Sequence, residues 1–260
     1  MRGATKRLWV AIVLVWAAGC SASGITADTT CGAYLSSDAG ERHAAAAAIA
    51  KDLKAYDAGS DVWGAGLDTD CTAASDRTLR AYLGGQETYD FPNVSMEPTL
   101  NVGDKVVVST QAYAGAPLRR GDIVLFNAPP SWSPDPAGAR FVKRVIGLGG
   151  DHVTCCDQRQ RLMVNGHPLD EPYLHPDGPA SSDPFDIVVP AGRLWLMGDH
   201  RTHSVDSREL YLRVQDITTA TVPADAVLGR AVVVFAAPGH TSPRWLTVPP
   251  TYAQLPDPPR

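Results

Sequence analysis

The chain has 260 residues, of which 44% are hydrophobic and 20% are charged. This composition is ordinary for a globular protein and allows one sizeable core in one or two domains. The formal net charge is −5, and no run of five or more basic residues occurs, which argues against nucleic acid as a partner. The acidic balance also argues against electrostatic binding to anionic lipid.

The N-terminal segment 1–19 is typical of an export signal or anchor. Basic residues precede an apolar run, Leu8 to Ala18, that is too short to span a bilayer comfortably as a helix. The run ends in small residues before Cys20 and resembles a lipobox, although Ala17 stands where that motif usually has leucine. We expect Cys20 to be lipidated and to become the new N-terminus. An ordinary secretory signal or a short uncleaved anchor are the alternatives.

Four further cysteines follow, and an even number in an exported chain indicates disulfides. Pairing Cys31 with Cys71 is the simplest scheme, and it would join the two helices that we predict next. The adjacent Cys155 and Cys156 could bond to each other, reach other partners or remain buried free thiols. No C-x-x-C or H-x-x-x-H spacing occurs, so no metal is expected.

Residues 21–90 are predicted to form a tether and a small helical subdomain. The segment 21–36 is expected to be a mobile tether. The stretch Asp38 to Asp57 is rich in Ala, Lys, Glu and Leu and predicts a helix, with Gly59 as its stop. A second, shorter helix is predicted from Ala73 to Leu83, because its apolar residues recur at helical spacing. We assign no chemistry to this region.

After residue 90 the pattern changes to short strands. Three Gly-Asp-x-Val units, which begin at Gly103, Gly121 and Gly150, combine turn residues with residues that favour strands. Further strands are predicted at Lys105 to Ser109, Phe141 to Leu148, Arg161 to Val164, Phe185 to Val189, Arg193 to Met197 and Val227 to Phe235.

The sequence Asn165-Gly166 predicts a tight hairpin turn. Closely spaced short strands without intervening helices indicate an antiparallel sheet. We therefore expect a mostly β, antiparallel domain over residues 91–236, preceded by the small helical segment. The Pro-rich end, residues 237–260, is expected to be a loosely held tail.

The stretch Asn93 to Leu100 places a serine, Ser95, in a short irregular segment before the strand predicted at Lys105. Pro98 fixes its own φ and biases Glu97 away from the helical region. Ser95 is therefore expected on a stiff loop. A serine hydroxyl in such a place is inert unless a base takes its proton.

Lys143 is a possible base. A free lysine is charged at neutral pH and accepts no proton, but burial among apolar groups lowers the pKa of the amine. Lys143 shares one face of its predicted strand with Phe141 and Val145, which favours its desolvation. A lysine that extends from a sheet edge into solvent is the commoner alternative.

Four segments of the chain, read together, resemble the sequence boxes of type I signal peptidases. They are Ser95 to Leu100, Gly121 to Val124, Arg140 to Val145 and Gly198 to Arg208, and they occur in family order with family-like spacing. The resemblance implies a serine endopeptidase at the outer face of the cytoplasmic membrane. Its implied substrates are exported preproteins, cut after a small residue with another small residue two positions earlier. No cofactor is implied.

The resemblance also implies a role for individual residues. Ser95 matches the nucleophile and Lys143 the general base of a Ser–Lys dyad. Ser204 matches the serine that orients the lysine amine, and Asp206 and Arg208 match the pair that braces the site. A nucleophile, a base and a group that orients the base repeat the logic of the serine protease triad.

Other positions match the family only in part. The backbone N–H of Ser95 would be one donor of the oxyanion hole. Many family members have serine two residues earlier and others have glycine, whereas this chain has Asn93, whose amide could donate or contribute nothing. Met96 matches a residue of the substrate-binding floor. His200 stands where the family usually has asparagine, and we expect His200 and His203 to be polar loop residues.

Two other functions remain open. The chain could be a dedicated Ser–Lys processing protease with one substrate, and residues 21–90 could then be a targeting or inhibitory module. It could also be an inactive, lipid-anchored binding protein on this fold, although the presence of Ser95, Lys143 and Ser204 together counts against this reading. The burial of Lys143 and its distance from Ser95 discriminate between active and inactive readings.

Overall fold

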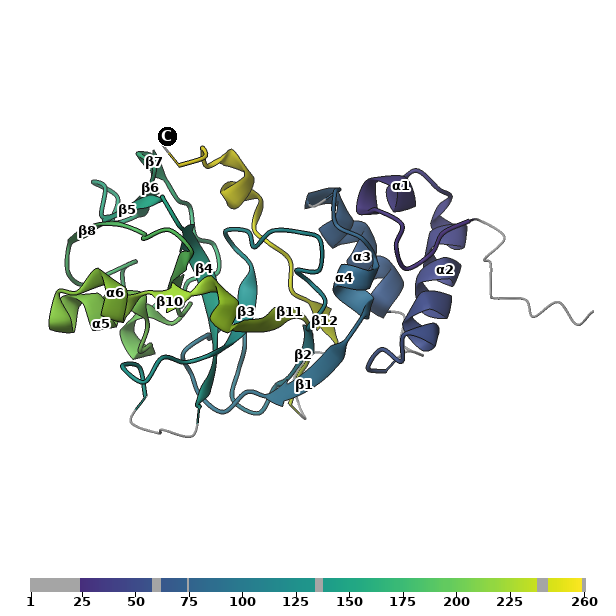
Figure 1. Cartoon of the computed structure of the whole chain (residues 1–260), viewed down its shortest axis with the longest axis horizontal. Coiled ribbons are helices and arrows are strands. Elements are labelled where there is room, and N and C mark those ends of the chain that lie inside the picture. Colours follow the sequence, from purple (N-terminus) through teal and green to yellow (C-terminus); the bar gives the residue numbers. More distant parts are fainter. Residues whose placement is uncertain (1–23, 58–61, 74, 134–137, 238–242, 259–260) are drawn as a thin grey trace, which may run out of the picture.

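The computed structural model describes residues 24–57, 62–73, 75–133, 138–237 and 243–258. The predicted signal segment, Cys20 and the helix stop at Gly59 lie outside these ranges. Helices α1 to α4 gather at one end of the molecule, beside a body of two β-sheets (Figure 1). No helix within the described ranges is both long enough and apolar enough to cross a bilayer.

The larger sheet contains eight antiparallel strands in the order β1-β2-β11-β3-β4-β9-β10, with β12 paired to β11. Its strands are β1 (Gln86–Asp90), β2 (Lys105–Ser109), β3 (Ile123–Asn127), β4 (Arg140–Leu148), β9 (Arg193–Met197), β10 (Val222–Pro223), β11 (Val227–Phe235) and β12 (Arg244–Trp245). The predicted antiparallel, mostly β fold is confirmed. Strand β1 was missed because its residues are polar on both faces and lack an apolar alternation.

The smaller sheet has the order β7-β6-β5-β8, with β5 at His152–Cys155, β6 at Leu162–Val164, β7 at His167–Pro168 and β8 at Phe185–Val188. Asn165 and Gly166 join β6 to β7 with positive φ angles of 51° and 78°, as the predicted hairpin turn requires. A side chain at Gly147 of β4 would approach Val153 of β5 to 3.0 Å. Glycine there lets the two sheets pack closely around one apolar cluster.

The helical segment consists of α1 (Cys31–Leu35), α2 (Ala39–Asp52), α3 (Val62–Ala73) and α4 (Arg80–Leu83). The first predicted helix is confirmed as α2, which begins after the N-cap Asp38 and ends at Asp52. The second prediction is wrong, because a helix precedes residue 73 and only α4 lies within the predicted range. The Arg77 carbonyl instead accepts a hydrogen bond from the Cys31 N–H, and the Leu79 N–H donates to the Thr29 carbonyl. These backbone groups would be needed for the hydrogen bonds of a helix.

The expected tether is also wrong for the residues described. Ile25 and Tyr34 are buried in the apolar cluster of the helical segment. A disulfide joins Cys31 of α1 to Cys71 of α3, as predicted. The structure also joins Cys155 to Cys156, which is the first of the three alternatives for that pair.

Buried charges connect the helical segment to the larger sheet. Asp122, in the turn before β3, lies 2.8 Å from Arg77 and 3.0 Å from Arg230 of β11. Arg230 also lies 2.9 Å from Asp70 of α3. Two carboxylates thus face two guanidinium groups, and the pairing offsets part of the desolvation cost of burying them.

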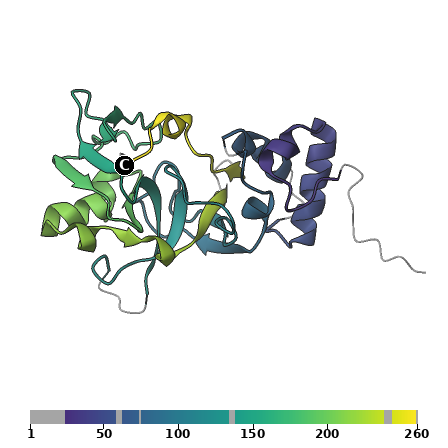
Figure 2. The ribbon, with the colours of Figure 1, turned by 45° about the horizontal axis from the view of Figure 1, so that its top comes forward.

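Residues 243–258 are packed rather than loosely held, so the tail prediction is wrong in this range. Strand β12 extends the larger sheet, and the Trp245 ring lies 5.4 Å from the Trp63 ring of α3. The chain then runs from the helices to the smaller sheet (Figures 1 and 2), where Asn165 donates a hydrogen bond to the carbonyl of Pro256. Buried Leu246 and Tyr252 outweigh the prolines that suggested disorder.

The remaining elements lie between β9 and β11 and near the C-terminus: η1 (Arg201–His203), α5 (Ser207–Val214), α6 (Ile217–Ala220), η2 (Ala224–Ala226) and η3 (Pro250–Gln254). Both η1 and α5 follow β9, which lies next to the edge strand β10 of the larger sheet. The domain boundaries drawn from the sequence stay predictions.

Candidate active site

Ser95 lies on the loop between β1 and β2. The loop is held at both ends by the buried side chains of Phe91 and Leu100. Within it, the Leu100 N–H donates to the carbonyl of Met96 at 2.9 Å, and the Glu97 N–H donates to that of Val94 at 3.1 Å. These bonds give the stiff loop that the sequence predicted.

Lys143 lies in β4, where it pairs with Val124 of β3, and the next residue, Arg144, pairs with Met197 of β9. Its side chain is 4% exposed, and its Nζ atom lies 2.6 Å from Ser95 Oγ. Burial lowers the pKa of the Lys143 amine to about 8, while the negative charges of Asp206 and Asp199 oppose the shift. The alternative of a lysine extending into solvent is therefore wrong.

A cavity of about 190 Å³ opens beside the two residues. Its lining residues are Tyr89, Phe91, Asn93, Ser95, Phe141, Val142, Lys143, His203 and Val205. Met96 is not among them. Its side chain is fully buried beneath the loop, in the same apolar cluster as Phe91 and Leu100. The structure therefore shows a packing role for Met96, and its contact with substrate stays a prediction.

Asn93 contacts the proposed nucleophile in an unexpected way. Its Oδ1 atom accepts a hydrogen bond from the backbone N–H of Ser95 at 3.0 Å. Asparagine commonly forms such a turn with the backbone two residues further on. In this geometry Asn93 acts as an acceptor and occupies the N–H that was expected to serve an oxyanion.

Ser204 is buried, and its Oγ atom has no hydrogen-bond partner among the described residues. A side chain at Gly198 would come within 2.2 Å of Ser204 Oγ and 2.4 Å of the Ser95 carbonyl oxygen. Only glycine at position 198 therefore allows Ser204 and the Ser95 backbone to lie this close to it. The expected hydrogen bond from Ser204 to Lys143 is not present.

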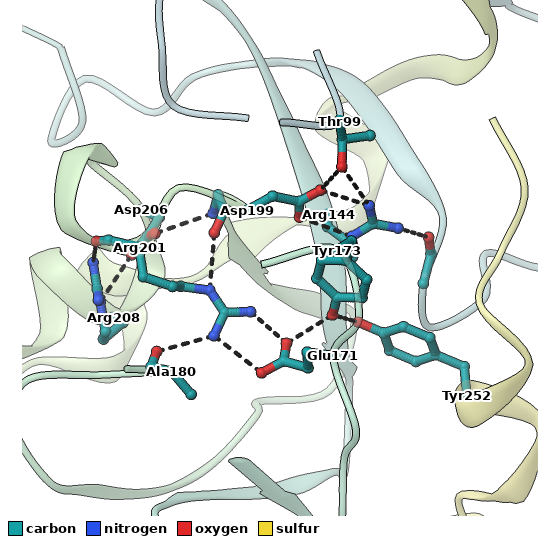
Figure 3. Close-up of polar contacts among 12 residues, drawn as sticks. Thr99, Arg144, Glu171, Tyr173, Ala180, Asp199, Arg201, Asp206, Arg208 and Tyr252 are labelled. Carbon is teal, nitrogen blue, oxygen red and sulfur yellow. Dashed lines mark hydrogen bonds and ion pairs between the residues drawn. The ribbon is translucent and has the colours of Figure 1, made fainter. Parts of the chain in front are cut away.

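Asp206 and Arg208 form the expected brace (Figure 3). The buried Asp206 carboxylate accepts hydrogen bonds from the Gly198 and Glu209 N–H groups, both at 3.1 Å. Arg208 Nε lies 3.5 Å from Asp206 Oδ1, and Arg208 Nη2 donates to the carbonyl of Arg201 at 2.6 Å. The pair fixes Gly198 and the start of α5 relative to each other.

A second ion pair supports the same loops and was not predicted. Arg144, next to Lys143, donates to Asp199 through Nε at 2.9 Å and through Nη2 at 2.6 Å. Thr99 of the Ser95 loop donates to Asp199 at 2.5 Å, and the Tyr173 ring lies 3.8 Å from the Arg144 guanidinium (Figure 3). The loop that carries Ser95 is thus tied to the strand that carries Lys143. Arg144 and Asp199 lie within recognised boxes, but their pairing leaves no local sequence signal.

Arg201 extends this support towards the smaller sheet. It donates to the carbonyls of Gly198 and Ala180, both at 2.9 Å, and it forms a buried ion pair with Glu171 (Figure 3).

The two histidines differ from the expected polar loop residues. His200 is 6% exposed, its backbone N–H donates to the Ser95 carbonyl at 3.1 Å, and its Nδ1 atom lies 3.1 Å from the Val94 carbonyl oxygen. His203 is exposed but lines the cavity beside Ser95. His200 was misjudged because its burial comes from loops that are distant in sequence.

Comparison with known proteins shows the family to which the chain belongs. A family model described as "Signal peptidase, peptidase S26" matches residues 79–236. The chain is 35% identical to the signal peptidase I of Mycobacterium tuberculosis, over 58% of this chain and 65% of that protein's length. It is 34% identical to the signal peptidase I of Bacillus caldolyticus, over 54% of this chain and 78% of the relative.

A solved structure of a signal peptidase I from Enterococcus faecalis is 28% identical and covers 44% of this chain and 96% of that chain, with a TM-score of 0.33. The family match includes Ser95, Lys143 and the brace formed by Asp206 and Arg208. On the extent of that match, the chain belongs to the signal peptidase family, peptidase S26.

Proposed function

We propose that this protein is a serine endopeptidase that removes signal peptides from exported preproteins, with Ser95 as nucleophile and Lys143 as general base. The observation that carries the proposal is the distance of 2.6 Å between Lys143 Nζ and Ser95 Oγ, with both groups buried. This distance lies in the range that proton transfer requires.

The proposed reaction depends on the protonation state of the Lys143 amine. When Lys143 is neutral, the Ser95 hydroxyl donates its proton to Nζ as Oγ attacks the carbonyl carbon of the scissile peptide. The ammonium then gives that proton to the departing amine, and an acyl-enzyme remains on Ser95. Water next attacks the acyl carbon and gives a proton to Lys143. The ammonium returns that proton to Ser95 Oγ as the bond between the acyl carbon and Oγ breaks, which releases the new carboxyl group and restores the hydroxyl.

The oxyanion of the tetrahedral intermediate needs a donor at the Ser95 N–H. Because Asn93 Oδ1 accepts that hydrogen bond, the substrate oxygen has to displace it. Rotation of the Asn93 side chain then presents its Nδ2 donors to the same oxygen. We propose that Ser95 N–H and Asn93 together stabilise the oxyanion, with Asn93 exchanging an acceptor for a donor when substrate binds.

Ser204 remains the group proposed to orient the Lys143 amine. Its buried hydroxyl is without a hydrogen-bond partner in the described part of the chain and lies against Gly198, next to the Ser95 backbone. A buried hydroxyl gains free energy from a hydrogen-bond partner, and the Lys143 amine is the partner that we propose. Asp206 and Arg208 hold this segment in place.

The substrate is proposed to bind as an extended peptide. Strand β1 is an edge strand of the larger sheet, and Tyr89, at its end, lines the cavity beside Ser95. An extended peptide can add to such an edge through main-chain hydrogen bonds. A cavity of about 190 Å³ favours small side chains next to the scissile bond because it excludes larger ones.

Attachment to the outer face of the cytoplasmic membrane is also part of the proposal. It rests on the apolar segment 1–19 and on Cys20, which lie outside the described residues. A lipid on Cys20 would hold the catalytic body near the site where preproteins emerge.

The decisive experiment compares cleavage of several preproteins by the full chain, Ser95→Ala and Lys143→Ala. Lys51→Ala, on the exposed surface of α2, serves as the matched lysine control. We expect cleavage by the full chain and by the control, and none by the two dyad variants when all are folded. Cleavage of one preprotein alone would favour the dedicated processing protease. An inert full chain, or active dyad variants, would refute the proposal.

A further inference from the structure

Three potential metal ligands meet beside the loop that carries Ser95. Asp177 comes from the segment between β7 and β8, whereas His200 precedes η1 as its N-cap and His203 is the last residue of η1. His200 Nε2 lies 2.8 Å from Asp177 Oδ2 and 3.0 Å from His203 Nδ1, and the third side of this triangle measures 3.6 Å. The three atoms are therefore already gathered around one point.

The size of this triangle fits a tetrahedral ion. Nitrogen and oxygen ligands bind zinc at about 2.0–2.1 Å, so neighbouring ligands around one tetrahedral ion are about 3.3 Å apart. The three observed separations lie on either side of that value. Two imidazoles and one carboxylate are also donors that zinc and its neighbours prefer, whereas magnesium and calcium prefer larger sets of oxygen ligands.

The surroundings of His200 orient it as a ligand. Its Nδ1 atom lies 3.1 Å from the Val94 carbonyl oxygen, so an Nδ1–H donates there and leaves Nε2 free for a metal. A histidine ligand commonly has such a carbonyl partner for its second nitrogen. A cation bound to Nε2 would replace the present contact of this nitrogen with Asp177.

Asp177 is oriented in a similar way. Thr202 Oγ1 donates to Asp177 Oδ2 at 2.7 Å, and His175 Nδ1 lies 2.9 Å from Asp177 Oδ1. Thr202 Oγ1 also lies 2.9 Å from His203 Nδ1, so a bound ion would replace that contact. The side chains of Asp177 and His203 are 34% and 59% exposed, which leaves room for water as a fourth ligand.

We propose that Asp177, His200 and His203 form a three-ligand site for a divalent transition metal of the zinc class. The sequence analysis expected no metal because the ligands come from separate segments and lack a familiar spacing. The site is distinct from the Ser–Lys pair but adjacent to it, because the His200 N–H donates to the Ser95 carbonyl. A bound ion would join the Asp177 segment to η1, and His200 contacts the Ser95 loop through its hydrogen bonds to the carbonyls of Ser95 and Val94.

The test is a binding experiment on the full chain after removal of metals with a chelator. Zinc is titrated by calorimetry, and cobalt(II) is titrated by visible absorption, which is intense for a four-coordinate ion and weak for an octahedral one. We expect one tight site per chain and intense cobalt absorption. His203→Gln and Asp177→Asn should each weaken binding by about 10-fold or more.

Two variants serve as controls. His167→Gln removes an exposed histidine far from the cluster in sequence and should bind zinc as the parent chain does. Glu97→Gln removes the carboxylate of the other possible ligand set, Glu97 with His175 and His200, and should also leave the affinity unchanged.

The proposal is overturned if zinc binds with no defined stoichiometry, if cobalt absorption is weak, or if the two ligand variants bind as tightly as the parent chain. His203 is mostly exposed, so His203→Gln keeps the test valid even if Asp177→Asn fails to fold. Peptidase activity is not the readout, and failure here leaves the proposed catalytic function untouched.

Discussion

Lys143 Nζ and Ser95 Oγ lie 2.6 Å apart although 48 residues separate them in the sequence. The lysine extends from the middle of β4, whereas the serine lies on the loop between β1 and β2. The bidentate pair of Arg144 with Asp199, together with Thr99, ties these two elements to each other. Ser95 and Lys143 therefore already lie within hydrogen-bond distance in the free protein, and substrate binding does not have to bring them together.

The pH dependence of cleavage tests whether Lys143 is the base. Its amine must be neutral, and burial lowers its pKa to about 8. We expect kcat/KM to rise as the pH rises through about 8 and to level off above it. The measurement is a pH profile with a peptide that contains a cleavage site. A profile that is already level at about pH 6 would point to a different base, since Lys143 would still be charged there.

Lys143→Met should abolish cleavage and stabilise the fold. The folded-state pKa of about 8 lies below the usual lysine value of 10.5, so burying the ammonium costs about 3 kcal/mol below pH 8. This cost falls as the pH rises from about 8 to 10.5, because the amine loses its proton in the unfolded chain as well. The gain from Lys143→Met should therefore be largest at neutral pH and small above pH 10.5.

Urea unfolding of both chains at neutral and at alkaline pH measures this difference. The other titratable groups contribute equally to the unfolding free energy of both chains, so their contributions cancel in the difference between the parent chain and Lys143→Met. A variant that is less stable than the parent chain at neutral pH would show that contacts of Lys143 outweigh its desolvation.

The sequence predicted those parts of the molecule that depend on neighbours along the chain. The strands β2, β4, β9 and β11 carry runs of apolar or β-branched residues. The pair Asn165-Gly166 favours a tight hairpin turn. The place of Lys143 between Phe141 and Val145 made it a candidate for burial but left the exposed alternative open. Helix α3 was missed although Trp63, Leu67 and Cys71 recur at helical spacing and are fully buried, because glycines and aspartates lie between them.

Contacts between distant segments could not be predicted in this way. The acceptor role of Asn93 depends on a loop conformation, and the burial of His200 depends on Asp177 and Val94, which come from two other loops. The ion pairs of Asp122 with Arg77 and Arg230 join three segments, and each of these residues alone resembles a solvated surface charge. A resemblance supplies the positions of such residues but not their partners.

Asn93→Asp should impair catalysis more than Asn93→Ala. Aspartate has almost the same shape, so its carboxylate would hold the Ser95 N–H more strongly and place a negative charge where the oxyanion forms. We expect kcat/KM to fall by about 100-fold or more for the aspartate variant, since the loss of one oxyanion donor has an effect of this size. Alanine frees the N–H and removes only the second donor.

Steady-state kinetics of the three chains on one substrate provide the comparison. Equal activity of Asn93→Asp and the parent chain would show that Asn93 Oδ1 does not occupy the oxyanion position.

The disulfide between Cys31 and Cys71 should contribute to stability. It closes a loop with a sequence separation of 40, and a loop of this length stabilises by about 4 kcal/mol in the chain-entropy model. The double variant Cys31→Ala, Cys71→Ala should lose stability of this order in urea unfolding. The matched control is Cys155→Ala, Cys156→Ala, which removes a bond between adjacent residues and so encloses no loop. Similar losses for both variants would argue against loop closure as the cause.

The C-terminal segment should support the active site as well as the fold. Leu246 is buried in the same apolar cluster as Met96 and Leu100 of the Ser95 loop, and Arg244 donates a hydrogen bond to the carbonyl of Thr99. Leu246→Ala leaves a cavity under that loop and should cost about 2–5 kcal/mol of stability. Because the loop carries Ser95, the proposed nucleophile, kcat should fall even at temperatures where the variant stays folded.

Gln254→Ala, at an exposed position of the same segment, is the control and should leave both stability and kcat unchanged. Thermal unfolding and cleavage rates are measured on all three chains. If the C-terminal segment were loosely held, the parent chain and the two variants would have the same stability and the same kcat. Loss of stability with unchanged kcat would limit the segment to a role in folding, whereas loss of both would show that the Ser95 loop depends on residues about 150 positions away for its geometry.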